Sequence, residues 1–257
     1  MFAQTLELLH SPSAWILYFI CAMLIGMSKT GIQNIGTLAV PLFAILFGAK
    51  QSTGIVLILL AMADLVAIIY YRKKLIWSEV LKLIPMALIG LIVALIFGNY
   101  IDDKTFKIVM ALCILIGVAI MIWMERTSDD KRTRVTSRKW YAPFFGFLMG
   151  FSTMIGNAAG PALSVYLLSR RLDKYTFVAT GAWFIMILNY IKIPLQSFVW
   201  HNLTWSGILL NLMALPFILL GGYMGIQLVK ILPEASFKKL IMILVVVSCL
   251  FMVVVNG

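Results

Sequence analysis

Three charged side chains stand inside otherwise apolar stretches of the sequence: Lys29, Asp64 and Lys192. Charged groups at membrane depth are rare and costly, so they are functional candidates by default. Lys29 stands between two hydroxyl residues, Ser28 and Thr30. A cation, hydroxyl groups and the unpaired backbone N–H groups of a helix start are what an oxyanion needs for binding. The alternative is a lysine at a turn that reaches one membrane face and is simply solvated.

Further polar side chains lie close to Lys29 and at a second position along the chain. They are Gln33 and Asn34 in the first place and Ser152, Thr153 and Asn157 in the second. These side chains could bind an anion. They could equally cap interrupted helices, because a helix broken inside lipid must satisfy its freed backbone groups. Both roles use the same place.

Four other residues are candidates for coupling or gating: Asp64, Lys192, Asn189 and Trp183. Asp64 lies near the middle of its apolar stretch, where it could carry a coupling proton, pair with Lys29 or be a neutral structural acid. Lys192 lies close to the predicted outer face. Its ammonium group could extend to the membrane surface, or it could join Asn189 in an outer anion vestibule. Trp183, deep in its stretch, could line a substrate path or pack in the interior.

The elements that position these residues must be membrane helices. Of the 257 residues, 62% are hydrophobic and 12% are charged, whereas soluble domains have roughly 45–50% apolar and about 25% charged residues. Several apolar stretches reach about 18 residues or more, which is enough to cross a bilayer. The predicted fold class is therefore an all-α, polytopic integral membrane protein. Soluble enzymes, nucleic-acid binders and secreted disulfide domains are excluded.

Six uninterrupted spans are predicted, each close to the ~20 residues that cross about 30 Å of hydrocarbon. They are Thr53–Tyr71, Val80–Gly98, Thr105–Met124, Thr176–Leu195, Trp205–Val229 and Phe237–Val255. A first and a second interrupted region, Ala14–Phe47 and Tyr141–Leu168, are too long for one upright helix and contain glycines and polar residues at 26–36 and 150–161. We expect each to be two short helices joined by a tight turn, or a re-entrant hairpin whose tip lies near the bilayer midplane.

Basic residues decide the orientation, because cytoplasmic loops carry an excess of Lys and Arg. The chain has 21 basic and 10 acidic residues, and the segment Glu125–Lys139 is especially rich in basic ones. If each interrupted region enters and leaves on one side, the basic loops near Arg72, Arg170 and Lys230 share the cytoplasmic side with this segment. Both termini then lie outside. We expect a multi-pass protein of the plasma or inner membrane.

The two halves of the chain match each other in the spacing of glycine, serine and proline. The matching positions are Gly26, Ser28, Gly36, Pro85 and Gly90 in the first half and Gly150, Ser152, Gly160, Pro216 and Gly221 in the second. Residues 1–124 and 141–257 are thus predicted to be two repeats of inverted topology, each an interrupted region followed by three spans, with the basic loop 125–140 between them. Matched interruptions in inverted repeats point to a transporter's binding site. We expect both to face one site.

This arrangement resembles the sulfite exporter (TauE/SafE) family of membrane anion permeases. The residues that carry the resemblance are Gly26, Gly31, Gly36 and Pro41 in the first half and Gly146, Gly150, Gly156, Gly160 and Pro161 in the second. The resemblance covers the whole length of the chain and the two-half arrangement. It implies transport of sulfite, an organosulfonate or a related small anion.

The leading functional hypothesis is a secondary transporter that exports a small anion, and the alternative is a passive anion channel or a membrane assembly factor. The sequence has no G-x-x-x-x-G-K-[ST] motif, so ATP hydrolysis by a P-loop is not expected. The two histidines, His10 and His201, cannot supply the clusters that metal-dependent membrane enzymes need. We therefore expect no enzymatic activity and no cofactor. The expected partners are a small anionic substrate and the lipid bilayer but no nucleic acid, and a homo-oligomer is compatible with the sequence.

Overall fold

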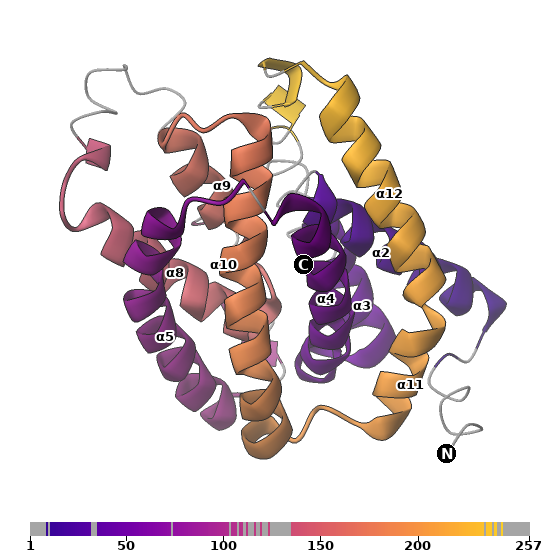
Figure 1. Ribbon diagram of the computed structural model, residues 1–257. Helices are drawn as coiled ribbons and strands as arrows, with labels where there is room; N and C mark the ends of the chain where they lie inside the picture. The colour runs from indigo at the N-terminus through magenta and orange to yellow at the C-terminus, as the bar shows by residue number, and fades with distance from the viewer. Residues whose placement is uncertain are drawn as a thin grey trace.

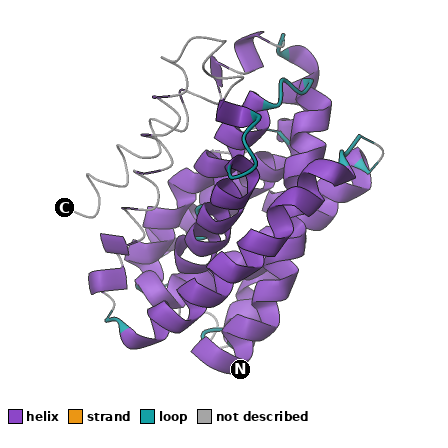
Figure 2. Cartoon of the chain, turned by 90° about the vertical axis from the view of Figure 1, so that its left-hand side faces the viewer, coloured by secondary structure: helices purple, strands orange, loops and turns teal. Residues whose placement is uncertain are grey.

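The computed structural model describes residues 11–31, 35–72, 74–102 and 135–233, together with residue 9 and short pieces between 104 and 243. Regular structure in these residues is helical, and the helices pack side by side as a bundle (Figure 1, Figure 2). The all-α prediction is confirmed for this part of the chain. The predicted spans Thr105–Met124 and Phe237–Val255 lie largely outside the described residues, as do residues 125–134 of the basic loop.

The elements follow one another as the apolar stretches do. In chain order they are α2 (Pro12–Thr30), η1 (Ile35–Leu38), α3 (Ala39–Phe47), α4 (Ala49–Tyr71), α5 (Trp77–Tyr100), α8 (Tyr141–Gly156), α9 (Gly160–Ser169), α10 (Lys174–Leu195), η2 (Gln196–Trp200), α11 (Trp205–Met213) and α12 (Leu215–Ile231).

Within the described ranges, four helices are long and apolar enough to cross a membrane: α2, α4, α5 and α10 together with η2. A further candidate span consists of α11 and α12, which meet at a bend of 52°. The uninterrupted span expected at Trp205–Val229 is therefore a bent one. The bend falls at Ala214 because Pro216, in the first turn of α12, has no backbone N–H with which to continue α11.

In both interrupted regions, the first helix ends within the glycine-containing segment where the sequence predicts a break. α2 ends at Thr30 and α3 begins at Ala39, while α8 ends at Gly156 and α9 begins at Gly160. The helices on the two sides of each interruption are unequal. The first helix of each pair is long: α2 has 19 residues and α8 has 16, which rise about 24–28 Å at 1.5 Å per residue. The second is short: α3 has 9 residues and α9 has 10, which rise about 14–15 Å. Each region is one long helix followed by one short helix, rather than two short ones.

Buried apolar side chains form two clusters, and each cluster combines helices from both halves of the chain. One consists mainly of residues from α2, α3 and α4, completed by Leu210, Ala214 and Ile218 of the α11–α12 span. The other consists mainly of residues from α8, α9 and α10, completed by α5. The last described span of each half therefore packs on the first helix of the other half.

Glycines allow the backbones of α2 and α12 to touch. A Cβ atom added to Gly26 would lie 2.2 Å from the carbonyl oxygen of Ile218, and one added to Gly221 would lie 2.0 Å from that of Met23. No side chain fits at such distances, and small residues at helix crossings are a usual means of close packing in membranes. The α2–α12 contact is a backbone-to-backbone contact.

The contact between α5 and α8 has the same construction. A Cβ atom added to Gly150 would lie 1.9 Å from the carbonyl oxygen of Ala87, and one added to Gly90 would lie 2.2 Å from that of Phe147. Both contacts follow one rule: the glycine of one helix touches the carbonyl oxygen of the residue that stands three positions before the glycine of the other helix. The same glycine-to-carbonyl pattern is thus used twice in the bundle.

The loops rich in Lys and Arg lie together at one end of the bundle. Arg170 pairs with Glu79 at 3.0 Å and donates to the carbonyl oxygen of Thr136 at 3.4 Å. Lys174 donates to the carbonyl oxygen of Leu232 at 2.6 Å. These contacts join the starts of α5 and α10 to the segments 135–140, 170–173 and 231–233, and we call this region the basic end.

Candidate binding site between the interrupted helices

A pocket of about 50 Å³ lies where the two interrupted regions meet. Its polar lining consists of Ser28 and Lys29 from the first half and Thr153, Asn157 and Asn189 from the second. Gly36 and Gly160, one from each interruption, also line it. A few water molecules or one small ion fill a space of this size. The structure thus brings five of the candidate residues, from both halves of the chain, to one cavity.

Lys29 is held by a buried ion pair behind the pocket. It is 8% exposed, and its Nζ lies 2.7 Å from Oδ1 of the fully buried Asp64 in α4. The other carboxylate oxygen of Asp64 accepts a hydrogen bond of 2.7 Å from Nδ2 of Asn189 in α10. Asp64 therefore holds two pocket-lining side chains from two different helices. A buried charge persists only with partners of this kind.

Lys192 has the matching role on the other side of the pocket. It is fully buried in α10, and its ammonium group donates hydrogen bonds to Oδ1 of Asn157 and, at 3.3 Å, to Oγ1 of Thr153. Both acceptors line the pocket. The interpretation that Lys192 extends to the membrane surface is therefore wrong. Its side chain points into the bundle because the C-terminal end of α8 supplies acceptors there.

Asn157 is fixed from several directions. It ends α8 in the left-handed conformation with φ of 52°, which asparagine tolerates better than most residues. Its backbone N–H donates to the carbonyl oxygen of Thr153 at 3.0 Å. Its Nδ2 donates to the carbonyl oxygen of Thr53 in α4 at 3.1 Å, while Oδ1 accepts from Lys192. The second interruption is thereby tied to the first half of the chain.

Lys29 lines the pocket, and Asp64 and Lys192 contact lining side chains from behind; with all three ionised, this group carries one positive charge in excess. An anion of one negative charge would balance it. In the described part of the chain, no group of three or more His, Cys, Asp or Glu residues is placed to hold a metal ion.

The comparison with protein-family models matches residues 17–252 to the sulfite exporter TauE/SafE family. The chain belongs to the TauE/SafE family. The match includes both interruptions and the residues around the pocket, and it confirms the resemblance noted in the sequence. No curated protein and no solved structure gives a match. TauE/SafE proteins are membrane transporters, so export of a small anion is the general function that family membership indicates.

The helix polarity at the pocket of this TauE/SafE protein differs from what the sequence suggests. Ser28 and Lys29 lie in the last turn of α2, and Thr153 lies near the end of α8, where unpaired carbonyl groups rather than N–H groups are found. Helix starts line the pocket on the other side of each interruption: Ala159 and Gly160 at the start of α9, and Gly36 of η1 with Val40 in the first turn of α3. A partial positive charge from α9 adds to those of the lysines.

Thr30 and Ser152 do not line the pocket. The hydroxyl group of Thr30 donates to the carbonyl oxygen of Gly222 in α12 at 2.7 Å. That of Ser152 donates to the carbonyl oxygen of Leu148, one turn earlier in α8, at 2.7 Å. Both hydroxyl groups are thus engaged with backbone carbonyl groups, the first at a helix crossing and the second within its own helix.

Three further candidates lie away from the pocket or outside the described residues. Trp183 packs against Trp77 near the basic end, with ring centroids 5.3 Å apart, and does not contribute to the pocket lining. Gln33 and Asn34 fall in residues 32–34, which the structure does not describe.

The sequence interpretation missed the apolar part of the pocket wall. Val56 and Leu60 of α4 and Gly181 and Ile185 of α10 line it. A signal for them exists, because α-helical residues four apart share a face. Steps of four residues back from Asp64 lead to Leu60 and Val56, and the same steps from Asn189 lead to Ile185 and Gly181. The two polar residues therefore mark the pocket-facing sides of α4 and α10.

Proposed function

We propose that this protein is a secondary transporter that exports a small sulfur oxyanion, such as sulfite or a short organosulfonate, bound in the pocket between the two interruptions. One observation carries the proposal: residues from both halves line a single small cavity, with Lys29 in its wall and Asp64 and Lys192 bound to lining side chains. Family membership supports sulfite as the type of substrate.

The binding mode follows from the contacts. Lys29 supplies the ammonium group, and Thr153 and Asn157 supply polar groups held in place by Lys192. The apolar wall of Val56 and Leu60 accommodates the carbon atoms of a short sulfonate. The size of the pocket favours small anions over large ones.

Asp64 couples anion binding to a proton. Its partner Lys29 lines the pocket, so an anion that accepts a hydrogen bond from Lys29 competes with the carboxylate for the same ammonium group. When Lys29 turns to the anion, Asp64 loses part of its counter-charge, and a proton on the carboxylate restores the balance. The substrate and the proton then occupy neighbouring positions during the transport cycle.

The proposal includes an inverted repeat that alternately exposes the pocket. Support comes from the two glycine-to-carbonyl contacts. Gly26 touches Ile218 and Gly150 touches Ala87, and each of these partners stands two residues after a matched proline, Pro216 or Pro85. The basic end faces the cytoplasm in this proposal, as the excess of Lys and Arg in cytoplasmic loops suggests. Both termini then lie outside. A negative potential inside assists export by about 2.3 kcal/mol per 100 mV for each net negative charge that moves outward, so a proton that travelled with the anion would reduce this contribution.

Counterflow in liposomes tests the proposal. The purified protein is reconstituted in vesicles loaded with unlabelled sulfite or a short alkanesulfonate, and uptake of the labelled anion is followed. We expect transient accumulation above equilibrium, which a carrier produces and a passive channel does not. Lys29→Ala should abolish the signal, whereas Lys104→Ala, which changes an exposed lysine outside the pocket, should retain it. Equilibration without accumulation would indicate a channel, and absence of any anion flux would refute the proposal.

A further inference from the structure

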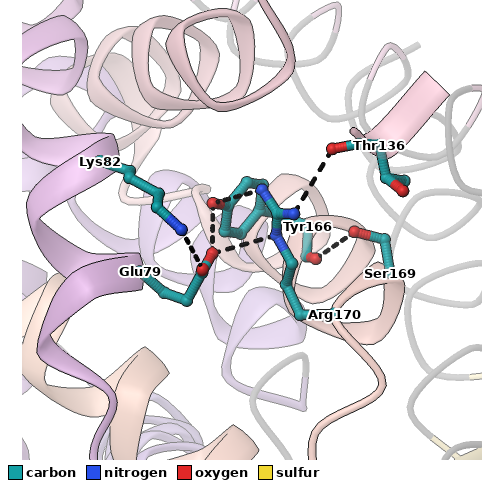
Figure 3. Close-up of polar contacts among 6 residues, drawn as sticks. All are labelled: Glu79, Lys82, Thr136, Tyr166, Ser169 and Arg170. Carbon is teal, nitrogen blue, oxygen red and sulfur yellow. Dashed lines mark hydrogen bonds and ion pairs between the residues drawn. The ribbon is translucent and has the colours of Figure 1, made fainter. Parts of the chain in front are cut away.

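A second polar cluster lies at the basic end, away from the pocket (Figure 3). Glu79, in the first turn of α5, is at its centre and is 8% exposed. Its Oε1 lies 2.6 Å from Nζ of Lys82. Its Oε2 accepts a hydrogen bond of 2.6 Å from the hydroxyl group of Tyr166 and lies 3.0 Å from Nε of Arg170. One carboxylate thus binds two side chains on α5 and α9 and a third just beyond the end of α9.

Arg170 extends this cluster to α8. Its guanidinium carbon lies 4.8 Å from the ring centroid of Tyr166 and 5.7 Å from that of Tyr141. Its Nη2 donates to the hydroxyl group of Tyr166 at 3.0 Å, and Nη1 donates to the carbonyl oxygen of Thr136 at 3.4 Å. The planar, multiply donating guanidinium group suits such a combination of stacking and charge-assisted hydrogen bonds. Four segments of the chain meet at this one side chain.

Helix α9 connects the cluster with the pocket. Its first turn includes Gly160 and Leu163, which line the pocket, and Tyr166 and Arg170 lie near and beyond its other end. Ten residues rise about 15 Å, so α9 covers the distance between the pocket and the basic end. Any movement of α9 away from α5 must break the contacts of Tyr166 and Arg170 with Glu79.

The positions related to this cluster by the proposed repeat carry apolar side chains in the described part of the chain. Counted from the matched glycines, the positions that correspond to Glu79, Tyr166 and Arg170 are occupied by leucines. These leucines are Leu210, Leu42 and Leu46, respectively, and all three belong to or pack against one apolar cluster. The contact between the short helix of one half and the last described span of the other is therefore polar on one side of the repeat and apolar on the other. A buried ion pair contributes little net stability. Its best attested use is to select one conformation or packing register over another, as in a conformational switch.

We propose that Glu79, Tyr166 and Arg170 form an ionic latch that holds α9 against α5 and closes the pocket toward the basic end. This inference rests on the proposed function, in which the basic end is cytoplasmic and the pocket opens alternately to the two sides. When the latch opens, water can solvate its charged groups, which lowers the free energy of the open state. The leucines at the matching place exclude water and close the other side by apolar contact. The two sides of the transporter are thus closed by different chemistry.

Thiol accessibility tests the latch without a substrate. The three native cysteines are replaced by alanine, and Leu163→Cys places a reporter thiol in the pocket wall. A membrane-impermeant maleimide is then added from the cytoplasmic side of inverted vesicles or from the outer side of right-side-out vesicles. Glu79→Gln should raise the rate of labelling from the cytoplasmic side by about tenfold, which corresponds to about 1.4 kcal/mol. The rate from the outer side should not rise.

Two further variants make the test specific. Tyr166→Phe removes one hydrogen bond to Glu79 and should raise the cytoplasmic labelling rate by a smaller factor, about threefold, and it carries the test if Glu79→Gln does not fold. Lys82→Gln is the matched control: its side chain is 52% exposed, so the loss of this ion pair should leave the rate within about twofold. Rates for Glu79→Gln and Tyr166→Phe equal to that of Lys82→Gln, or raised equally from both sides, would overturn the latch. Labelling needs no transported anion, so failure of sulfite counterflow with a working latch would refute only the proposed function.

Discussion

The buried ion pair between Lys29 and Asp64 permits a quantitative test of how the pocket is held together. Their charged atoms lie 2.7 Å apart, and both side chains are nearly or fully shielded from solvent. At an effective dielectric constant of about 20, the attraction over this distance is about 6 kcal/mol. Much of it offsets the desolvation of the two groups, so we expect removal of one partner to destabilise the fold by about 3–5 kcal/mol.

A double-mutant cycle measures this interaction. Lys29→Met leaves Asp64 buried without its cation, and Asp64→Asn leaves Lys29 without its anion. For a chain of this size, 1 kcal/mol shifts the unfolding temperature by about 2–4 °C, so each single variant should lower it by about 6–20 °C. The double variant buries neither charge and should unfold within about 5 °C of the wild-type protein. Thermal unfolding of the purified protein in detergent, followed by tryptophan fluorescence, gives these temperatures.

The chain contains a matched control for this experiment. Lys82 and Glu79 form an ion pair of nearly the same length, 2.6 Å, but the Lys82 side chain is 52% exposed. Exposed pairs contribute about 0–1 kcal/mol, so Lys82→Met should lower the unfolding temperature by no more than about 4 °C. If the effects of Lys29→Met and Asp64→Asn simply add in the double variant, the two residues do not stabilise each other and the reasoning about the pocket is refuted.

Three other outcomes are expected. Lys192→Met removes the donor to Thr153 and Asn157. Because hydrogen bonds from charged groups are worth about 1.5–3 kcal/mol, sulfite binding measured by isothermal titration calorimetry should weaken by at least about tenfold. Unchanged affinity would mean that Lys192 does not support the pocket. Gly150→Ala places a Cβ atom 1.9 Å from a carbonyl oxygen of α5 and should destabilise the protein by about 1–3 kcal/mol, seen as a lower unfolding temperature. Gly207→Ala is the control: its nearest contact is a side-chain oxygen at 3.2 Å, so the unfolding temperature should fall less. Burial alone would raise the pKa of Asp173, but hydrogen bonds from Thr176 and Tyr175 outweigh it and lower the pKa. Its capping of α10 therefore stabilises the fold above the unfolded pKa and is lost as pH falls through the folded one. Asp173→Ala should remove about 1 kcal/mol from the unfolding free energy measured at neutral pH, and progressively less as the pH is lowered into the acid range.

Within the described residues, three of the uninterrupted spans, those at Thr53–Tyr71, Val80–Gly98 and Thr176–Leu195, and both interruptions are found where the sequence predicts them, because apolar length and glycine clusters are local properties. The sequence also singles out Lys29 and Asp64, since a charge inside an apolar stretch is visible without knowledge of its partner. It misplaces the end of α2, however, because glycine has two uses. Gly26 does not interrupt its helix but admits the carbonyl group of Ile218, and only the packed structure distinguishes this use from a break.

The direction of a long side chain is also decided by tertiary structure. Lys192 lies near the end of its span, where extension to the membrane surface is the simplest expectation. The structure offers the ammonium group two acceptors at the end of α8 instead. Similarly, the bend between α11 and α12 at Ala214 requires knowledge of how the neighbouring helices α2 and α4 are arranged, although Pro216 marks the place at which it could occur.

The exchange of helices between the two halves has a consequence for biosynthesis. α2 leaves the ribosome well before α12, but its glycine face packs on α12. Until α12 is made, the backbone at Gly26 lacks its partner Ile218. The helices made earlier must therefore stay incompletely packed in the membrane or be shielded by an insertion factor. Neither half should fold to completion alone. Two fragments separated within residues 125–134 should regain the bundle only when both are synthesised in the same cell.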